Sequence, residues 1–308
     1  MPAKLMCVRR LLLLLFFLLW AIPFAVLSTL LCHGQPAPGI PPALAPAQAQ
    51  ALVGRALATE LRDARDQNHP MRYRLRKSSP RLTTTKEIVE TRDGDVARMV
   101  SVFDKPLSQA DEQKEQARLD ALMSNPNLQK HRKQGEDQDF GIVLKLLRML
   151  PKAFLYEYAG ATAGPAGPVE KFTFRPNPQF SPPDLETQAL TAMTGEIRID
   201  AAQERVTRLE GHLQQDTNYG WGVLGKLDKG GWIVLDQADV GANQWRIVRF
   251  QMAMNLRILF KNKSSDTTEE MTQYLPVPLG IDYRRAIQML RDGRGNGVQA
   301  SRKRERVP

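Results

Sequence analysis

The sequence predicts an α+β fold in which a strongly curved antiparallel β-sheet wraps around an apolar interior and is covered by helices. Three observations lead to this class: a long amphipathic strand from Trp245 to Lys261, several strand pairs joined by turn signals, and a nearly all-apolar helix over 140–150. The chain has 308 residues and is 42% hydrophobic, so it can bury a core as one large domain or two modest ones.

The first thirty residues have the pattern of an export segment. Lys4, Arg9 and Arg10 precede an uncharged run of 21 residues from Leu11 to Leu31, which is long enough to span a bilayer as a helix. Because the basic end stays in the cytoplasm, the chain that follows is translocated. We therefore expect a periplasmic or envelope protein.

The fate of this segment, residues 1–32, stays open at the sequence level. Small residues around Ala47 and Ala49 suit a cleaved signal peptide, whereas the length of the apolar run suits a signal anchor held in the inner membrane through residues 11–31. Lipidation at Cys32 is a third alternative. Residues 33–50 are rich in Pro, Ala and Gln and are typical of a flexible spacer.

The first half of the exported chain combines helices with a strand hairpin. A helix is expected over 51–67, and Arg92-Asp93-Gly94-Asp95 is a hairpin signal. Ser108 caps a further helix that Asn125-Pro126 closes. Residues 127–139 are polar and predict a loop or loose helix before the apolar helix Phe140 to Leu150, which Pro151 stops. The strands expected in this half lie near 71–77, 82–91 and 96–103.

The second half is mainly β, with expected strands at 154–158, 169–174, 196–200, 205–213 and 232–235 before the long strand. A short helix begins at Asp184, and another covers 282–290. We expect one β-rich domain over 51–290, with a helical insertion at about 108–150, and a basic disordered tail over 291–308.

The long strand from Trp245 carries the most specific prediction. From Val248 every second residue is apolar, while Arg249, Gln251, Asn255 and Arg257 occupy the opposite face. Alternation kept over this length places one face on the core without a phase slip, and so long a strand must twist and coil. The expected core-facing residues are Val248, Phe250, Met252, Met254, Leu256, Ile258 and Phe260.

Several function classes find no support in the residues. The net charge of +10 lies mostly in the first ten residues and the Arg-rich tail, so the central region is only mildly basic and no nucleic-acid partner is expected. Both cysteines lie in or beside the export segment, and the four histidines lack metal-ligand spacing, so no metal site is expected. Without a catalytic motif, neither an enzyme nor a cofactor is predicted.

The order of elements resembles the bacterial periplasmic lipoprotein-carrier superfamily (the LolA/LolB-like fold). The resemblance covers 52–290 and rests on hairpins such as GEIRIDAAQERVTRLEG and GGWIVLDQADVGANQW, which lead into the long strand. It implies an incomplete antiparallel barrel whose concave face, covered by helices, holds acyl chains. The apolar face from Val248 to Phe260 would then be the binding sheet. The helix would be a lid whose contacts are Phe140, Val143, Leu144 and Leu147.

We therefore expect an envelope protein that binds a lipid or an acylated protein in an apolar concavity of its sheet, in lipid or lipoprotein trafficking. The alternative is a membrane-tethered structural or scaffolding protein that binds another envelope protein. For Phe250, Met252 and Met254, the competing interpretation of the pattern is ordinary core packing.

Overall fold

The computed structural model describes residues 44–164, 167–219, 225–258 and 261–292. The predicted export segment, most of the predicted spacer and residues 293–308 of the predicted tail lie outside the described residues. Among the described residues, no helix is both long enough and apolar enough to cross a membrane.

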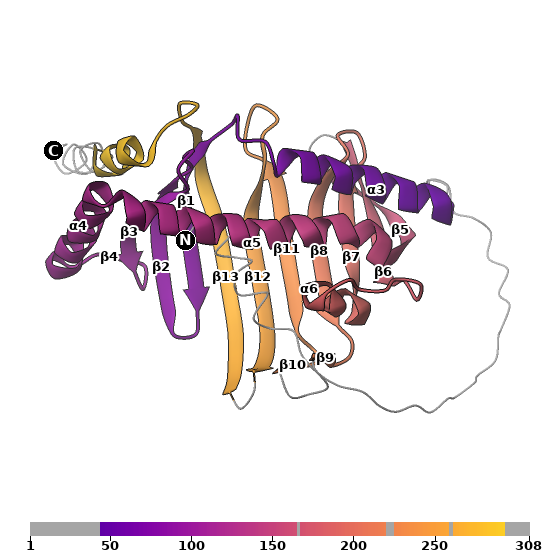
Figure 1. Ribbon diagram of the computed structural model, residues 1–308. Coiled ribbons are helices and arrows are strands. Elements are labelled where there is room, and N and C mark those ends of the chain that lie inside the picture. Colours follow the sequence, from indigo (N-terminus) through magenta and orange to yellow (C-terminus); the bar gives the residue numbers. More distant parts are fainter. Residues whose placement is uncertain (1–43, 165–166, 220–224, 259–260, 293–308) are drawn as a thin grey trace, which may run out of the picture.

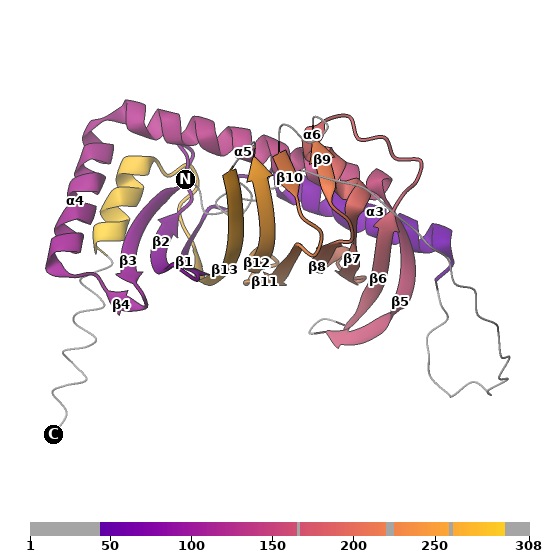
Figure 2. The same ribbon diagram turned by 90° about the horizontal axis from the view of Figure 1, so that it is seen from below.

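The described strands form one 13-stranded antiparallel sheet that does not close into a barrel (Figure 1). Its order is β4-β3-β2-β1-β13-β12-β11-β8-β7-β6-β5, with β10 pairing β12 and β9 pairing β10. Figure 2 shows the curvature of the sheet, which confirms the predicted α+β class. The strands are β1 (Met71–Ser79), β2 (Leu82–Val89), β3 (Val96–Val102), β4 (Lys105–Pro106), β5 (Phe154–Gly164), β6 (Gly167–Pro176), β7 (Met193–Asp200), β8 (Arg205–Leu213), β9 (Thr217–Tyr219), β10 (Gly225–Leu227), β11 (Trp232–Asp239), β12 (Trp245–Ile258) and β13 (Lys261–Pro276).

The helices lie mainly on one face of this sheet. They are α3 (Pro46–Asp63), α4 (Gln109–Ser124), α5 (Pro126–Ala153), α6 (Leu185–Gln188) and the 3-10 turn η1 (Ala189–Ala192), and residues 283–292 are also helical. In Figure 1, α5 crosses the sheet from β3 to β6, and α3 contacts α5, β5 and β8. The main core fills the space between these two helices and the sheet. A second cluster joins β2 and β3 to α4 and the helix over 283–292.

Helix α5 is longer than the sequence predicts at both ends. It begins at Pro126, in the segment expected to be loop or loose helix, and continues through Pro151 to Ala153. The side chain of Asn125 caps its first turn, and a Lys133–Asp137 ion pair supports its polar half. Pro151 is tolerated because it falls in the last turn, where the helix loses only one hydrogen bond.

Strand β12 contains a bulge that the alternating pattern does not reveal. Gln237 pairs with Ile247 and Asp236 with Arg249, which leaves Val248 without a partner on β11. Ile247, rather than Val248, therefore packs against the main core. The prediction of an alternation without a phase slip from Val248 is wrong at this point, because an extra residue reverses the faces.

Strand β13 is absent from the sequence prediction. The expected long strand instead ends at Ile258, and β13 returns antiparallel to it from Lys261. The residues of β13 on the same face as the core include Lys263, Ser265 and Thr267. Because these side chains are polar, the strand carries no apolar alternation from which it could be recognised.

Side chains of the flanking helices cap both edges of the sheet. On one edge, Glu115 and Arg118 of α4 hydrogen-bond a backbone N–H and C=O of β3. On the other, the amide of Gln50 donates to the carbonyl of Phe154 and accepts from the N–H of Tyr156. These contacts occupy edge groups that would otherwise be open to pairing with another strand.

Candidate functional site

An apolar cavity of about 190 Å³ lies between α5, the α6–η1 segment and the core face of the sheet. One side of α5 contributes Val143, Leu146, Leu147 and Leu150. The other lining residues are apolar or glycine except for Glu186 and Tyr156, whose hydroxyl donates to the carbonyl of Leu150. They are Phe154, Tyr156, Phe174, Glu186, Ala189, Leu190, Met193, Leu209, Gly211, Leu227, Ile233, Leu235, Phe250 and Met254.

Two strand glycines let large side chains lie close to the sheet beside this cavity. A Cβ at Gly195 would come 2.7 Å from Cζ of Phe174, and one at Gly211 would come 2.6 Å from the sulfur of Met193. The Phe174 ring then packs on Phe154, with ring centroids 4.5 Å apart. The positions of Phe174 and Met193 beside the cavity therefore require glycine at 195 and 211.

An ion pair attaches the middle of α5 to α6 at the cavity rim. Lys145 Nζ lies 2.9 Å from Asp184 Oδ2 and 3.3 Å from Glu186 Oε2. Burial by itself would raise the pKa of Asp184, but hydrogen bonds from Lys145 and Thr187 hold that pKa below its usual value. The hydrogen bond that Lys145 donates to Asp184 in turn raises the pKa of Lys145.

The structure brings some of the predicted binding residues into this cavity and places others elsewhere. Phe250 and Met254 line it from β12, and Val143 and Leu147 line it from α5. Met252 and Leu256 are buried in the core without lining the cavity, while Val248 lies at the bulge and Leu144 is half-buried. The side chain of Ile258 and all of Phe260 lie outside the described residues.

Sequence reasoning missed Leu146 and Leu150, and the walls that β5, β6 and β8 supply. The helical residues could have been found, because 143, 146, 147 and 150 recur at the spacing of a single helix face. The wall from distant strands carries no local signal, since only the strand order brings it beside β12.

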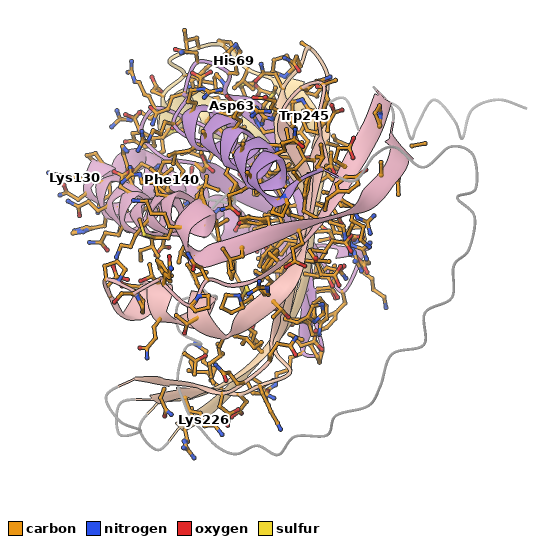
Figure 3. All side chains as sticks on the ribbon, turned by 90° about the vertical axis from the view of Figure 1, so that its right-hand side faces the viewer. Asp63, His69, Lys130, Phe140, Lys226 and Trp245 are labelled. Atoms are coloured by element: carbon orange, nitrogen blue, oxygen red, sulfur yellow. The ribbon has the colours of Figure 1, made fainter. Side chains whose placement is uncertain are left out.

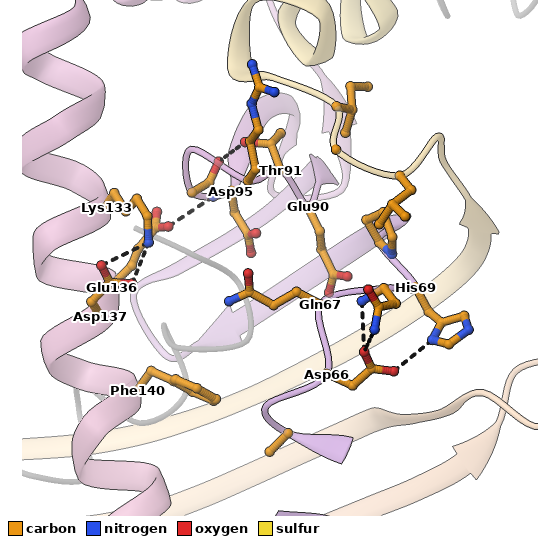
Figure 4. A pocket seen from close by; sticks show the side chains of 18 residues that line it. Asp66, Gln67, His69, Glu90, Thr91, Asp95, Lys133, Glu136, Asp137 and Phe140 are labelled. Atoms are coloured by element: carbon orange, nitrogen blue, oxygen red, sulfur yellow. Dashed lines mark hydrogen bonds and ion pairs between the residues drawn. The ribbon is translucent and has the colours of Figure 1, made fainter. Parts of the chain in front are cut away.

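The predicted lid residue Phe140 lies instead in a polar pocket of about 370 Å³ beside the polar half of α5 (Figure 4). Figure 3 shows Phe140 on α5 next to α3. In this pocket Glu136 accepts a hydrogen bond from the backbone N–H of Asp95 at 3.0 Å, and burial raises its pKa. Burial and the nearby charges of Asp95 and Glu90 also raise the pKa of Tyr73 well above its usual value. Nowhere in the described ranges are three His, Cys, Asp or Glu side chains arranged to hold a metal ion.

Comparison with known proteins yields a weak structural likeness. No family model matches the chain, and no curated protein matches its sequence. A crystal structure described as an outer membrane lipoprotein-sorting protein domain from Vibrio parahaemolyticus matches with 11% identity and a TM-score of 0.28. The match covers 74% of this chain and 94% of that domain. A likeness with so low a TM-score carries no conclusion about function.

Proposed function

We propose that this protein binds a lipid or an acylated ligand, with the acyl chain in the apolar cavity between α5 and the sheet. The observation that carries the proposal is the cavity itself, whose lining is apolar except for Glu186 and the Tyr156 hydroxyl. An apolar cavity of about 150 Å³ stays dry and binds small apolar molecules. A cavity of about 190 Å³ offers the same environment to part of an acyl chain.

Helix α5 is the element that would move to admit a longer chain. Every lining residue that it contributes is only half-buried, in contrast to the fully buried Phe154 beneath it. Gly135 and Gly141 lower the helix propensity of α5, and a Cβ at either glycine would meet nothing within 4 Å. Outward displacement of α5 would therefore enlarge the cavity without breaking the sheet.

The site of action that we propose is the cell envelope. Its support is the basic and apolar pattern of residues 4–31. Cell fractionation followed by N-terminal sequencing of the mature protein tests this part: recovery of the protein in the cytoplasmic fraction would exclude it.

A cavity-filling substitution tests the binding proposal. Ala189 is 5% exposed and lines the cavity, so Ala189→Leu places three further carbons in the proposed acyl site. The purified full chain should bind a fluorescent fatty acid, and Ala189→Leu should weaken that binding about tenfold or more while retaining the melting temperature of the wild type. Ala159→Leu, at an exposed position of β5, is the matched control and should bind like the wild type. Equal binding by all three proteins, or no binding to any of them, contradicts the proposal.

A further inference from the structure

The polar inner face of β13 lies directly beside the apolar inner face of β12. In the antiparallel pairing, Leu256 lies opposite Lys263, Met254 opposite Ser265, and Met252 opposite Thr267. Side chains directly opposite one another have Cβ atoms about 5 Å apart and share one face of the sheet. The core face therefore changes from apolar to polar between two neighbouring strands.

A third pocket, of about 660 Å³, lies in the corner where the β1–β2 hairpin ends and β13 continues. In Figure 1, β12 and β13 extend beyond the turn of that hairpin. The cations that line the pocket are Lys77, Arg81 and Lys263, against a single carboxylate, Asp266. Lys77 pairs with the fully buried Glu269, whereas Arg81 and Lys263 form no ion pair among the described residues.

Ser265 provides an independent indication that this pocket receives a ligand. Ser265 is one of the residues that line the pocket and is only 6% exposed, yet its hydroxyl has no hydrogen-bond partner within the described part of the chain. A buried hydroxyl without a partner costs free energy, so natural structures rarely leave one unless a ligand or water completes it. The residue opposite Ser265, Met254, lines the apolar cavity.

We propose that the ligand is an amphiphile with an anionic, oxygen-rich headgroup, a phosphate or a carboxylate, which lies in the pocket of Lys77, Arg81, Lys263 and Ser265. Its acyl chain lies in the cavity beside Met254, so this inference rests on the proposed function. Arg81 and Lys263 neutralise the headgroup, and the hydroxyl of Ser265 donates to one of its oxygens. The Met254–Ser265 pair is the boundary between chain and headgroup.

Two lysophospholipids with the same acyl chain test the proposal on the full-length protein. Lysophosphatidylglycerol has an anionic headgroup, whereas lysophosphatidylcholine is zwitterionic. The wild type should bind the anionic lipid about tenfold more tightly, and Arg81→Gln with Lys263→Gln should abolish this preference by weakening the binding of the anionic lipid more than that of the zwitterionic lipid. The control is Lys130→Gln with Arg249→Gln, which removes the same charge from exposed positions outside the pocket and should keep the preference.

Ser265→Ala separates a ligand contact from a structural role. The substitution removes a buried hydroxyl that has no protein partner, so the melting temperature should stay the same or rise. Affinity for lysophosphatidylglycerol should fall about threefold to tenfold. A lower melting temperature with unchanged lipid affinity would show that the hydroxyl serves the fold, and it would overturn this assignment.

The remaining outcomes distinguish the inference from the proposed function. If the wild type binds both lipids with equal affinity, the proposed anionic headgroup is wrong, whereas the proposed acyl cavity is unaffected. Tight binding of inorganic phosphate that does not compete with lysophosphatidylglycerol overturns the joint site, because the pocket would then serve a free anion. Failure of every lysophospholipid to bind overturns both.

Discussion

Gly195 and Gly211 lie beside the cavity, where backbone or side-chain atoms occupy the space that a Cβ would need. Any larger residue at these two positions would clash. At Gly195 an added Cβ would lie 1.9 Å from the carbonyl oxygen of Glu210, which is backbone and cannot turn aside. Gly195→Ala should therefore lower the free energy of unfolding by about 3 kcal/mol, measured by urea denaturation. Gly54→Ala, in α3 with open space around it, should instead raise stability by about 0.5–1 kcal/mol. A neutral effect at Gly195 would show that β7 and β8 are not packed in this way.

Glu136 should make stability depend on pH. Because burial raises its pKa in the folded protein, its contribution to stability is present below the ordinary pKa of about 4.5 and is lost as the pH rises through the raised value. Glu136→Gln keeps an oxygen that accepts from Asp95 and removes the charge. The variant should therefore melt higher than the wild type at pH 7, and the difference should close by about pH 4.

The control for this pH effect is the neighbouring Asp137→Asn, whose side chain is 62% exposed. That substitution should leave the pH dependence of the melting temperature unchanged. Parallel melting curves of wild type and Glu136→Gln from pH 4 to pH 8 would contradict the assigned shift.

Strands and helices differ in how well the sequence reveals them. The apolar stretch of α5 and the alternation in β12 are predictable, because each has a regular apolar period. The polar half of α5 and β13 are not, since few of their side chains are apolar, although Met271 of β13 is buried in the main core. Lys263 and Ser265 of the inferred headgroup site therefore lie in a strand that apolar periodicity cannot detect.

The attachment of α5 through Lys145 should control how fast a ligand leaves. Its ion pair with Asp184 is partly exposed, so Lys145→Gln should change stability by less than about 1 kcal/mol. Release of a bound fluorescent fatty acid, followed by stopped flow, should nevertheless become several-fold faster. Lys152→Gln, an exposed position at the end of the same helix, should release at the wild-type rate.

The pH dependence of this release follows from the same pair. The lowered pKa of Asp184 keeps the pair intact above about pH 4, and the raised pKa of Lys145 keeps it intact to above about pH 10. Release from the wild type should be constant between these limits and accelerate below about pH 4. An equal acceleration in Lys145→Gln would show that another group is responsible.

Across the whole molecule, the sequence predicts the class of fold better than its topology. Alternating apolar residues indicate a curved antiparallel sheet, but they do not indicate that β1 pairs with β13 across nearly two hundred residues. That pairing places the β1–β2 hairpin on the other side of β13 from β12, and so sets the basic pocket beside the apolar inner face of β12. The caps from Gln50, Glu115 and Arg118 also depend on tertiary contacts, so no local pattern predicts them.

Photo-crosslinking with a fatty acid that carries a diazirine near its methyl end tests the acyl cavity most directly. After irradiation of the full-length protein and peptide mapping by mass spectrometry, the label should lie on the cavity face of α5, at Val143 or Leu147, and on Phe250 or Met254 of β12. Ala189→Leu should remove most of that label. Label on the second core cluster or spread over the outer face of the sheet, with no loss in Ala189→Leu, would contradict the account.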